Sequence, residues 1–327
     1  MIGPLAIMPC MSSVFLFPGQ GSQSVGMLSD LAAHHSQVRE TFDTASEVLG
    51  FDLWALSQQG PAERLALTEI TQPLMLVAGV ATWRVWRALG GAEPTWVAGH
   101  SLGEFTALVA AGVLDFSEAV DLVRFRGEIM RDAVPDGQGG MAAIIGLDDA
   151  TLIDACREAA GDQVAEAVNF NAPGQVVIAG HVEALRRAIE VAKARGAKRA
   201  LPLPISVPCH SSLMQPAAER LRERLRGCHV TAPSIRFLSS VDACEYAEPE
   251  HIRDLLYRQL ASPVRWVLTI EALLARGVTQ FVECGPGKVL AGLTRRIDKS
   301  PQLQIMALES AEQFATVGTE FGKGVSP

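Results

Sequence analysis

The chain's 327 residues, 48% of them hydrophobic, suffice for one large α/β domain or a main domain that carries a smaller one, and they include no apolar run of the roughly 20 residues needed to cross a bilayer. The formal charge of −8 argues against nucleic acid as a partner. The six cysteines form neither a C-x-x-C pair nor a histidine-spaced set, so we expect reduced thiols, a cytoplasmic location and no metal site.

The first predicted strand covers residues 14–17. Residues 1–11 before it lack the basic region of a secretory signal and are predicted to be a flexible end, with Met11 as an alternative start. After the strand comes a turn, Pro18-Gly19-Gln20-Gly21-Ser22-Gln23. Its spacing is Gly-x-Gly-x-x-Ser and not the Gly-x-Gly-x-x-Gly of dinucleotide-binding loops, so a turn is the better interpretation.

A pentapeptide of the form Gly-x-Ser-x-Gly follows the next predicted strand, at residues 99–103, and runs directly into a helix. A strand that turns sharply into a helix holds the serine hydroxyl clear of the sheet and aims the helix N-terminus at charge that develops there. This context predicts Ser101 as a nucleophile. The pentapeptide alone leaves open a serine that only caps the helix.

Strands alternate with helices along the rest of the chain, which predicts a parallel sheet with helices on both faces. After a loop at 135–140 the pattern changes to βαββαβ, with strands at 141–147, 164–169, 175–179 and 198–202, and helices at 148–160 and 182–195. This order is that of a ferredoxin-like unit. We therefore predict an α/β fold with an α/β-hydrolase-like parallel-sheet core and an inserted small ferredoxin-like (βαββαβ) subdomain.

The predicted large domain is discontinuous and covers residues 12–134 and 206–310. The small subdomain covers 135–205, and the polar tail at 311–327 is predicted to be a second flexible end.

A serine nucleophile needs a base within hydrogen-bond reach and donors for the oxyanion. Of the seven histidines, His210 is the best placed, because an extended proline-bounded segment meets a helix start there, whereas His100 is expected to point away from Ser101. A capping or buried core histidine is an equally good interpretation of His210 from spacing alone. The neighbouring Cys209 is a weaker nucleophile candidate, because neighbours in an extended segment point apart.

No carboxylate in the sequence is well placed to orient that histidine. The best acid between Ser101 and His210 is Asp136, which lies in the loop opening the small subdomain. We therefore predict a Ser-His dyad whose imidazole is oriented by a backbone carbonyl. Backbone N–H groups of Gln20 and Leu102 are predicted to form the oxyanion hole.

Several motifs in order together resemble the malonyl-CoA:acyl-carrier-protein transacylases of type II fatty acid synthesis, over residues 13 to 310. They are Phe17-Pro-Gly-Gln-Gly-Ser-Gln23, Gly99-His-Ser-Leu-Gly-Glu104, Arg124-Phe-Arg-Gly127, Asn169-Phe-Asn-Ala-Pro-Gly-Gln175, Val207-Pro-Cys-His210 and Glu283-Cys-Gly-Pro-Gly287. One departure is Ala261-Ser262-Pro263-Val264, where the family has Tyr-Asn-Pro-Val. This departure concerns local packing more than the chemistry.

The resemblance implies that Ser101 carries a malonyl ester and that His210 serves as general base and then as acid. It places Arg126 where the family pairs an arginine with the free carboxylate of malonate, a bidentate, charge-assisted contact. Gln259 matches the position whose main-chain carbonyl orients the histidine, and Gln259 and Asn169 are grouped with Arg126 as substrate-binding. A surface arginine on an amphipathic helix is the plain alternative for Arg126.

The implied reaction is ping-pong transfer from malonyl-CoA to the phosphopantetheine thiol of holo acyl carrier protein, by a monomer with no tightly bound cofactor. Docking of the acidic carrier is predicted at two basic groups, Lys198 with Arg199 and Arg295 with Arg296. The alternatives are a discrete acyltransferase of a polyketide synthase, a patatin-like hydrolase using the Asp136-Gly137 pair, and a non-enzymatic carrier-binding module.

Overall fold

The computed structural model describes the backbone of residues 12–321 and the side chains of residues 12–317. The predicted flexible end at 1–11 lies outside the described residues. The main sheet has six strands in the order β10-β9-β1-β2-β7-β8, all parallel except the last pair. Its strands are β1 (Ser12–Phe17), β2 (Trp96–Gly99), β7 (Arg236–Leu238), β8 (Glu245–Tyr246), β9 (Val278–Cys284) and β10 (Gln304–Leu308).

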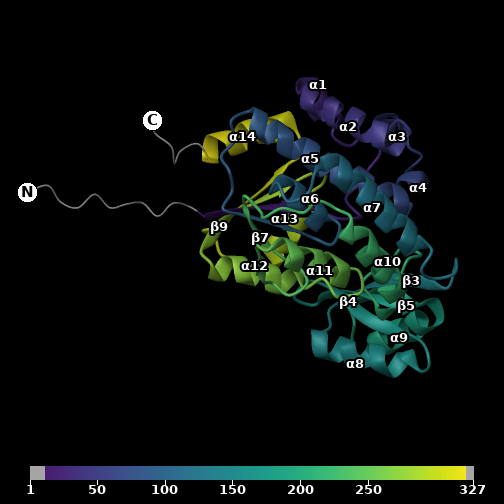
Figure 1. The fold of residues 1–327 in the computed structure, drawn as a ribbon. Helices are drawn as coiled ribbons and strands as arrows, with labels where there is room; N and C mark the ends of the chain where they lie inside the picture. Colours follow the sequence, from purple (N-terminus) through teal and green to yellow (C-terminus); the bar gives the residue numbers. More distant parts are fainter. Residues whose placement is uncertain (1–11, 322–327) are drawn as a thin grey trace, which may run out of the picture.

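Both faces of this sheet are covered by helices, as expected for parallel strands that are apolar throughout (Figure 1). Phe15 and Val97 pack among helices of one face, and Val14 and Trp96 among helices of the other. The first face is covered by α2 (Ser36–Leu49), α5 (Thr68–Ala88), α6 (Gly103–Ala110) and α7 (Phe116–Arg131), and the second by α12 (Trp266–Ala275) and α13 (Val289–Ile297).

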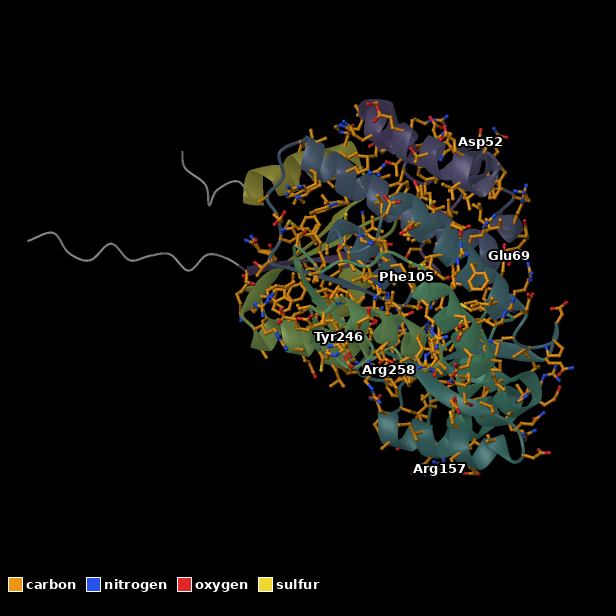
Figure 2. The ribbon with its side chains drawn as sticks, viewed as in Figure 1. Asp52, Glu69, Phe105, Arg157, Tyr246 and Arg258 are labelled. Carbon is orange, nitrogen blue, oxygen red and sulfur yellow. The ribbon has the colours of Figure 1, made fainter. Side chains whose placement is uncertain are left out.

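The remaining helices of this part of the chain connect or flank the main sheet. In Figure 2 the labelled Phe105 of α6 lies in the interior of the molecule, where it is fully buried. The flanking helices are α1 (Ser29–His34), α3 (Leu53–Gln59), α4 (Ala62–Leu65), the 3-10 turn η1 (Ser212–Met214), α10 (Gln215–Arg226) and α11 (Pro249–Gln259). No helix within residues 12–321 is both long and apolar enough to span a bilayer.

A second, antiparallel sheet has the order β4-β5-β3-β6 and carries α8 and α9 on one face, at the bottom of Figure 1. With the βαββαβ sequence of its elements, this order is that of a ferredoxin-like unit, so the predicted fold class is confirmed. The domain boundaries at 134/135 and 205/206 stay a prediction. The elements are β3 (Gly139–Ile145), α8 (Asp149–Ala160), β4 (Ala165–Ala172), β5 (Gln175–His181), α9 (Val182–Ala194) and β6 (Arg199–Pro202).

The prediction of a flexible end at 311–327 is wrong over its first part. Residues Ala311–Phe321 form the helix α14, with Phe314 and Val317 buried against the main core. Two apolar residues three positions apart on a helix share a face, and this short signal was outweighed by the polar residues around it. Residues 322–327 lie outside the described part.

Candidate active site

Ser101 lies in the sharp turn between β2 and α6 and has a left-handed backbone, with φ of 52°. The flanking glycines are required by close backbone packing. A Cβ on Gly99 would lie 2.0 Å from the carbonyl carbon of Gly103, and one on Gly103 would lie 1.9 Å from the main-chain oxygen of Phe17. The turn is therefore pressed against the end of β1, and the serine side chain is held above the sheet edge.

His210 lies beside that hydroxyl, with its Nε2 atom 2.7 Å from Ser101 Oγ. Its Nδ1 atom lies 3.0 Å from the main-chain oxygens of both Gln259 and Ser262. Because carbonyl oxygens only accept, Nδ1 carries the proton, and Nε2 accepts the hydrogen bond from Ser101. Among the described residues His210 has no carboxylate partner, and Asp136 is exposed on a loop away from this site.

Strand β4 of the small sheet is hydrogen-bonded to two segments beside the imidazole, one at Ser212 and one at Val264. His210 has a left-handed backbone, with φ of 66°. Two residues later, the N–H and hydroxyl of Ser212 donate to the carboxylate of Glu166 in β4, each at 2.8 Å. On the other side, the N–H of Val264 donates to the main-chain oxygen of Val168 at 2.8 Å. These contacts stabilise a backbone conformation that is unfavourable for a non-glycine residue.

Burial and the nearby Arg126 charge lower the pKa of His210 to about 3. The imidazole is therefore neutral at physiological pH and free to accept a proton from Ser101. Burial raises the pKa of the adjacent Cys209 thiol to about 11. Since the thiolate is the reactive form of cysteine, this environment does not favour Cys209 as the nucleophile.

Arg126 in α7 is 1% exposed, so the alternative of a surface arginine is wrong. Its Nη1 donates to Gln72 Oε1 at 2.8 Å and its Nη2 donates to Gln259 Oε1 at 3.0 Å. Its Nε has no partner among the described residues. Burial lowers the pKa of Arg126 to about 10, which leaves the guanidinium charged at neutral pH. A buried cation held by neutral amides is suited to receiving an anion.

Ser101, Arg126 and His210 line one cavity of about 410 Å³. His100 also lines it, and its Nε2 lies 2.8 Å from Asn171 Oδ1. The cavity brings together six of the seven predicted site residues, which are Gln20, Ser101, Leu102, Arg126, Asn169 and His210.

A family model described as "Acyl transferase domain" matches residues 14–319. The chain belongs to this acyl transferase family. It is 57% identical over 283 residues to the "Malonyl CoA-acyl carrier protein transacylase" of Salmonella typhimurium, covering 86% of this chain and 92% of the relative. The Bacillus subtilis protein of the same name is 44% identical over 299 residues, covering 91% of this chain and 93% of the relative.

Solved structures agree. An acyl carrier protein S-malonyltransferase from Vibrio cholerae is 52% identical with a TM-score of 0.90, covering 94% of this chain and 99% of that one. A malonyl-transacylase in complex with a type II PKS acyl-carrier protein is 50% identical with a TM-score of 0.93, covering 94% of this chain and 99% of the other. The resemblance identified in the sequence is thereby confirmed.

Gln259 of this acyl transferase differs from the prediction in one respect. It was grouped with the substrate-binding residues, but it is 0% exposed and does not line the cavity. It lies behind the site, where its main-chain oxygen faces His210 and its amide contacts Arg126. It is a positioning residue, because it is buried behind the cavity wall and contacts both His210 and Arg126.

Two further cavity residues of the acyl transferase were missed. Gln72 holds Arg126 from α5, and Asn171 holds His100 from β4. Asn171 was detectable, because residues two apart on a strand share a face and Asn169 was already a candidate. A glutamine within the long apolar run of α5 was the only signal for Gln72.

The N–H groups of Gln20 and Leu102 have no acceptor among the described residues. Gln20 follows the end of β1, and Leu102 follows Ser101 after the neighbouring strand β2. Phe17 and Gly99 are paired across these two parallel strands. Both N–H groups therefore lie at the same edge of the sheet as the serine hydroxyl.

Proposed function

We propose that this acyl transferase moves a malonyl group from malonyl-CoA to the phosphopantetheine thiol of an acyl carrier protein, through an ester on Ser101. The observation that carries the proposal is a buried arginine in the same cavity as the Ser101–His210 pair, with no carboxylate hydrogen-bonded to it among residues 12–317. The names of the relatives at 57% and 44% identity support the same substrate pair.

In the first half-reaction, Ser101 Oγ attacks the thioester carbonyl while His210 Nε2 takes the hydroxyl proton. The N–H groups of Gln20 and Leu102 stabilise the oxyanion, and the main-chain oxygens that face Nδ1 stabilise the imidazolium. As the tetrahedral intermediate collapses, the carbon–sulfur bond breaks and the CoA sulfur takes the proton from Nε2. In the second half-reaction, the carrier thiol attacks the ester carbonyl while His210 Nε2 takes the thiol proton. The ester bond to Ser101 then breaks, and Ser101 Oγ takes the proton from Nε2.

In the proposed complex, Arg126 pairs with the free carboxylate of the malonyl group, while Asn169 lines the cavity beside it. This contact fixes the acyl chain through both half-reactions. Since an uncharged acyl group lacks the contact, the proposal predicts selectivity for malonyl over acetyl groups.

Docking of the acidic carrier is proposed at the end of the small sheet nearest α13. Gln175 and Arg199 are both paired with Ile145 and so lie about two strand spacings apart, near 10 Å. Arg296 donates to the Gln175 side chain and so lies at the same end of the sheet as Arg199. Lys198 precedes Arg199, and Arg295 precedes Arg296.

Two rows of side chains lead from this basic end to the cavity. Along the extended chain through β6, Arg199, Leu201 and Leu203 are spaced two residues apart and so face the same side. Leu201 is 57% exposed, and Leu203 lines the cavity. On α13, Leu293 and Val289 line the cavity and share a helix face with Arg296. A phosphopantetheine arm laid along the apolar rows would place its phosphate at the basic end and its thiol at Ser101.

We also infer that the protein works as a cytoplasmic monomer.

The test is acyl loading followed by discharge, measured by intact-protein mass. We expect malonyl-CoA to leave a malonyl adduct that holo carrier protein removes and that apo carrier protein leaves in place. Rapid loss of the adduct to water would instead support a hydrolase, and no adduct would contradict the proposal. Because one solved neighbour was captured with a type II PKS carrier, fatty-acid and polyketide carriers are compared side by side.

A further inference from the structure

A fully buried carboxylate, Glu104, lies three residues after Ser101 in the first turn of α6. Its Oε1 accepts hydrogen bonds from the N–H of Ser240 at 2.5 Å and from the Ser240 hydroxyl at 3.0 Å. Its Oε2 accepts one from Gln259 Nε2 at 2.5 Å. Burial raises the pKa of Glu104, and these donors oppose the rise. Short contacts from donors on both oxygens are those of an ionised carboxylate.

Glu104 fixes which way round the Gln259 amide lies. Gln259 Nε2 donates to Glu104 and to the main-chain oxygen of Ser101 at 2.9 Å, and both of these groups only accept. Gln259 Oε1 must then face the other side, where it accepts from Arg126 Nη2. A reversed amide would place two N–H donors against each other at Arg126.

Glu104 also supplies a negative charge near Arg126. Among the described residues the guanidinium has only amides as hydrogen-bond partners. Burial lowers the pKa of Arg126, and Cys209 and then Glu104, which acts across Gln259, oppose this fall. We propose that Glu104 is a positioning residue for the acyl-carboxylate site: it orients the Gln259 amide, which in turn fixes Arg126 for a dicarboxylic half-thioester. This inference rests on the proposed function.

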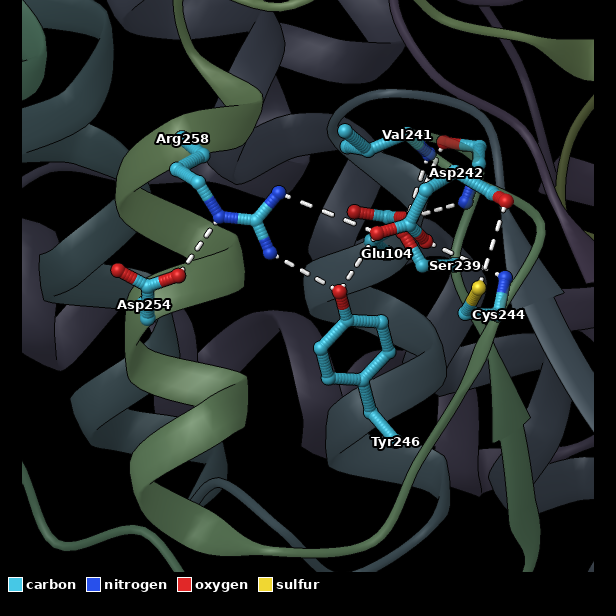
Figure 3. Close-up of polar contacts among 9 residues, drawn as sticks. Glu104, Ser239, Val241, Asp242, Cys244, Tyr246, Asp254 and Arg258 are labelled. Carbon is cyan, nitrogen blue, oxygen red and sulfur yellow. Dashed lines mark hydrogen bonds and ion pairs between the residues drawn. The ribbon is translucent and has the colours of Figure 1, made fainter.

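The main chain of Gln259 is held separately from its side chain. The preceding residue, Arg258, donates to Asp254 at 2.6 Å and to Tyr246 at 2.9 Å, and Tyr246 donates to Asp242 at 2.6 Å (Figure 3). This cluster fixes the end of α11 and hence the carbonyl that faces His210. A change at Glu104 is therefore expected to disturb Arg126 while leaving the Ser101–His210 pair in place.

The decisive variant is Glu104→Gln, which keeps the size of the side chain. The N–H of Ser240 requires an oxygen, so the new amide nitrogen would face Gln259 Nε2. The Gln259 amide then either loses this contact or reverses against Arg126 and the main-chain oxygen of Ser101, and in both cases the position of Arg126 is less well fixed. We expect kcat/KM for malonyl loading of Ser101 to fall about tenfold, from loss of one hydrogen bond to a charged group. Acetyl loading, which does not use Arg126, is expected to stay within about twofold.

The matched control is Tyr246→Phe, which removes hydrogen bonds from the neighbouring cluster without touching Glu104. It is expected to leave the malonyl-to-acetyl ratio at the wild-type value. If Glu104 had a purely structural role, Glu104→Gln would lower kcat/KM for malonyl and for acetyl loading by the same factor. That result, or a malonyl-to-acetyl ratio that shifts as much in Tyr246→Phe, would overturn the inference.

If Glu104→Gln does not fold, Gln259→Met provides the same test. It removes the Oε1 acceptor of Arg126 and keeps the main-chain oxygen that faces His210, so the same fall in the ratio is expected, and an unchanged ratio contradicts the inference. The proposed function fails separately, if the wild-type protein takes up no malonyl group. A wild-type protein that loads malonyl beside a Glu104→Gln variant with unchanged selectivity refutes only the role of Glu104.

Discussion

Replacing Arg126 by alanine removes the only buried cation on the cavity wall within the described residues. If Arg126 pairs with the malonyl carboxylate through two charge-assisted hydrogen bonds, the loss costs about 3 kcal/mol, or about a hundredfold in kcat/KM. Acetyl loading makes no such contact and is expected to change by no more than about threefold. Loading of Ser101 by each thioester, followed in single turnovers by intact mass, measures the two rates separately.

Two controls separate substrate binding from damage to the site. Arg126→Lys keeps the charge and loses the forked geometry, so it is expected to recover only part of the malonyl rate. Removing the Arg126 charge also relieves one cause of the low pKa of His210, so the pH profile of acetyl loading is expected to move upward. If malonyl and acetyl loading fall by the same factor in Arg126→Ala, the role assigned to the guanidinium is wrong.

Four further predictions concern the histidine, the docking residues and the turn at Ser101. Because the pKa of His210 is lowered to about 3, malonyl loading is expected to be flat between about pH 5 and 8, and an inflection near 6.5 would contradict this. Unfolded chains protonate the histidine below about 6.5 and the folded protein does not, so the unfolding free energy is expected to fall as pH drops through that range, less steeply in His210→Gln. Charge reversal at Lys198 and Arg199 is expected to raise KM for the carrier and weaken its salt dependence while leaving malonyl-CoA loading intact; unchanged carrier kinetics would remove these residues from docking. Gly103→Ala, whose Cβ would lie 1.9 Å from the main-chain oxygen of Phe17, is expected to lose about 3 kcal/mol in urea unfolding, and a loss near zero would contradict the packing of the turn.

The strand and helix pattern was predictable wherever the apolar period was long and bounded by glycine or proline. The βαββαβ order of the small sheet came directly from such segments. Helix α14 was missed because only Phe314 and Val317 mark its buried face, and a two-residue signal is weaker than the polar composition around it.

The candidate site was predictable to the extent that local sequence encodes local geometry. The elbow at Ser101 is determined by two flanking glycines within five residues. The place of Gln259 behind Arg126, and of Gln72 beside it, depends on which helices pack together across the core. No short-range pattern reports such contacts, so the sequence alone grouped Gln259 with the residues that line the cavity, although its main-chain oxygen faces His210 as the resemblance implied.

The central claim is that a malonyl ester forms on Ser101. Digestion of the malonyl-CoA-treated protein, followed by tandem mass spectrometry, locates the ester on a single residue. We expect the adduct on the peptide that contains Ser101 and none in Ser101→Ala. An adduct on Cys209 or elsewhere, or undiminished loading of Ser101→Ala, would contradict the mechanism.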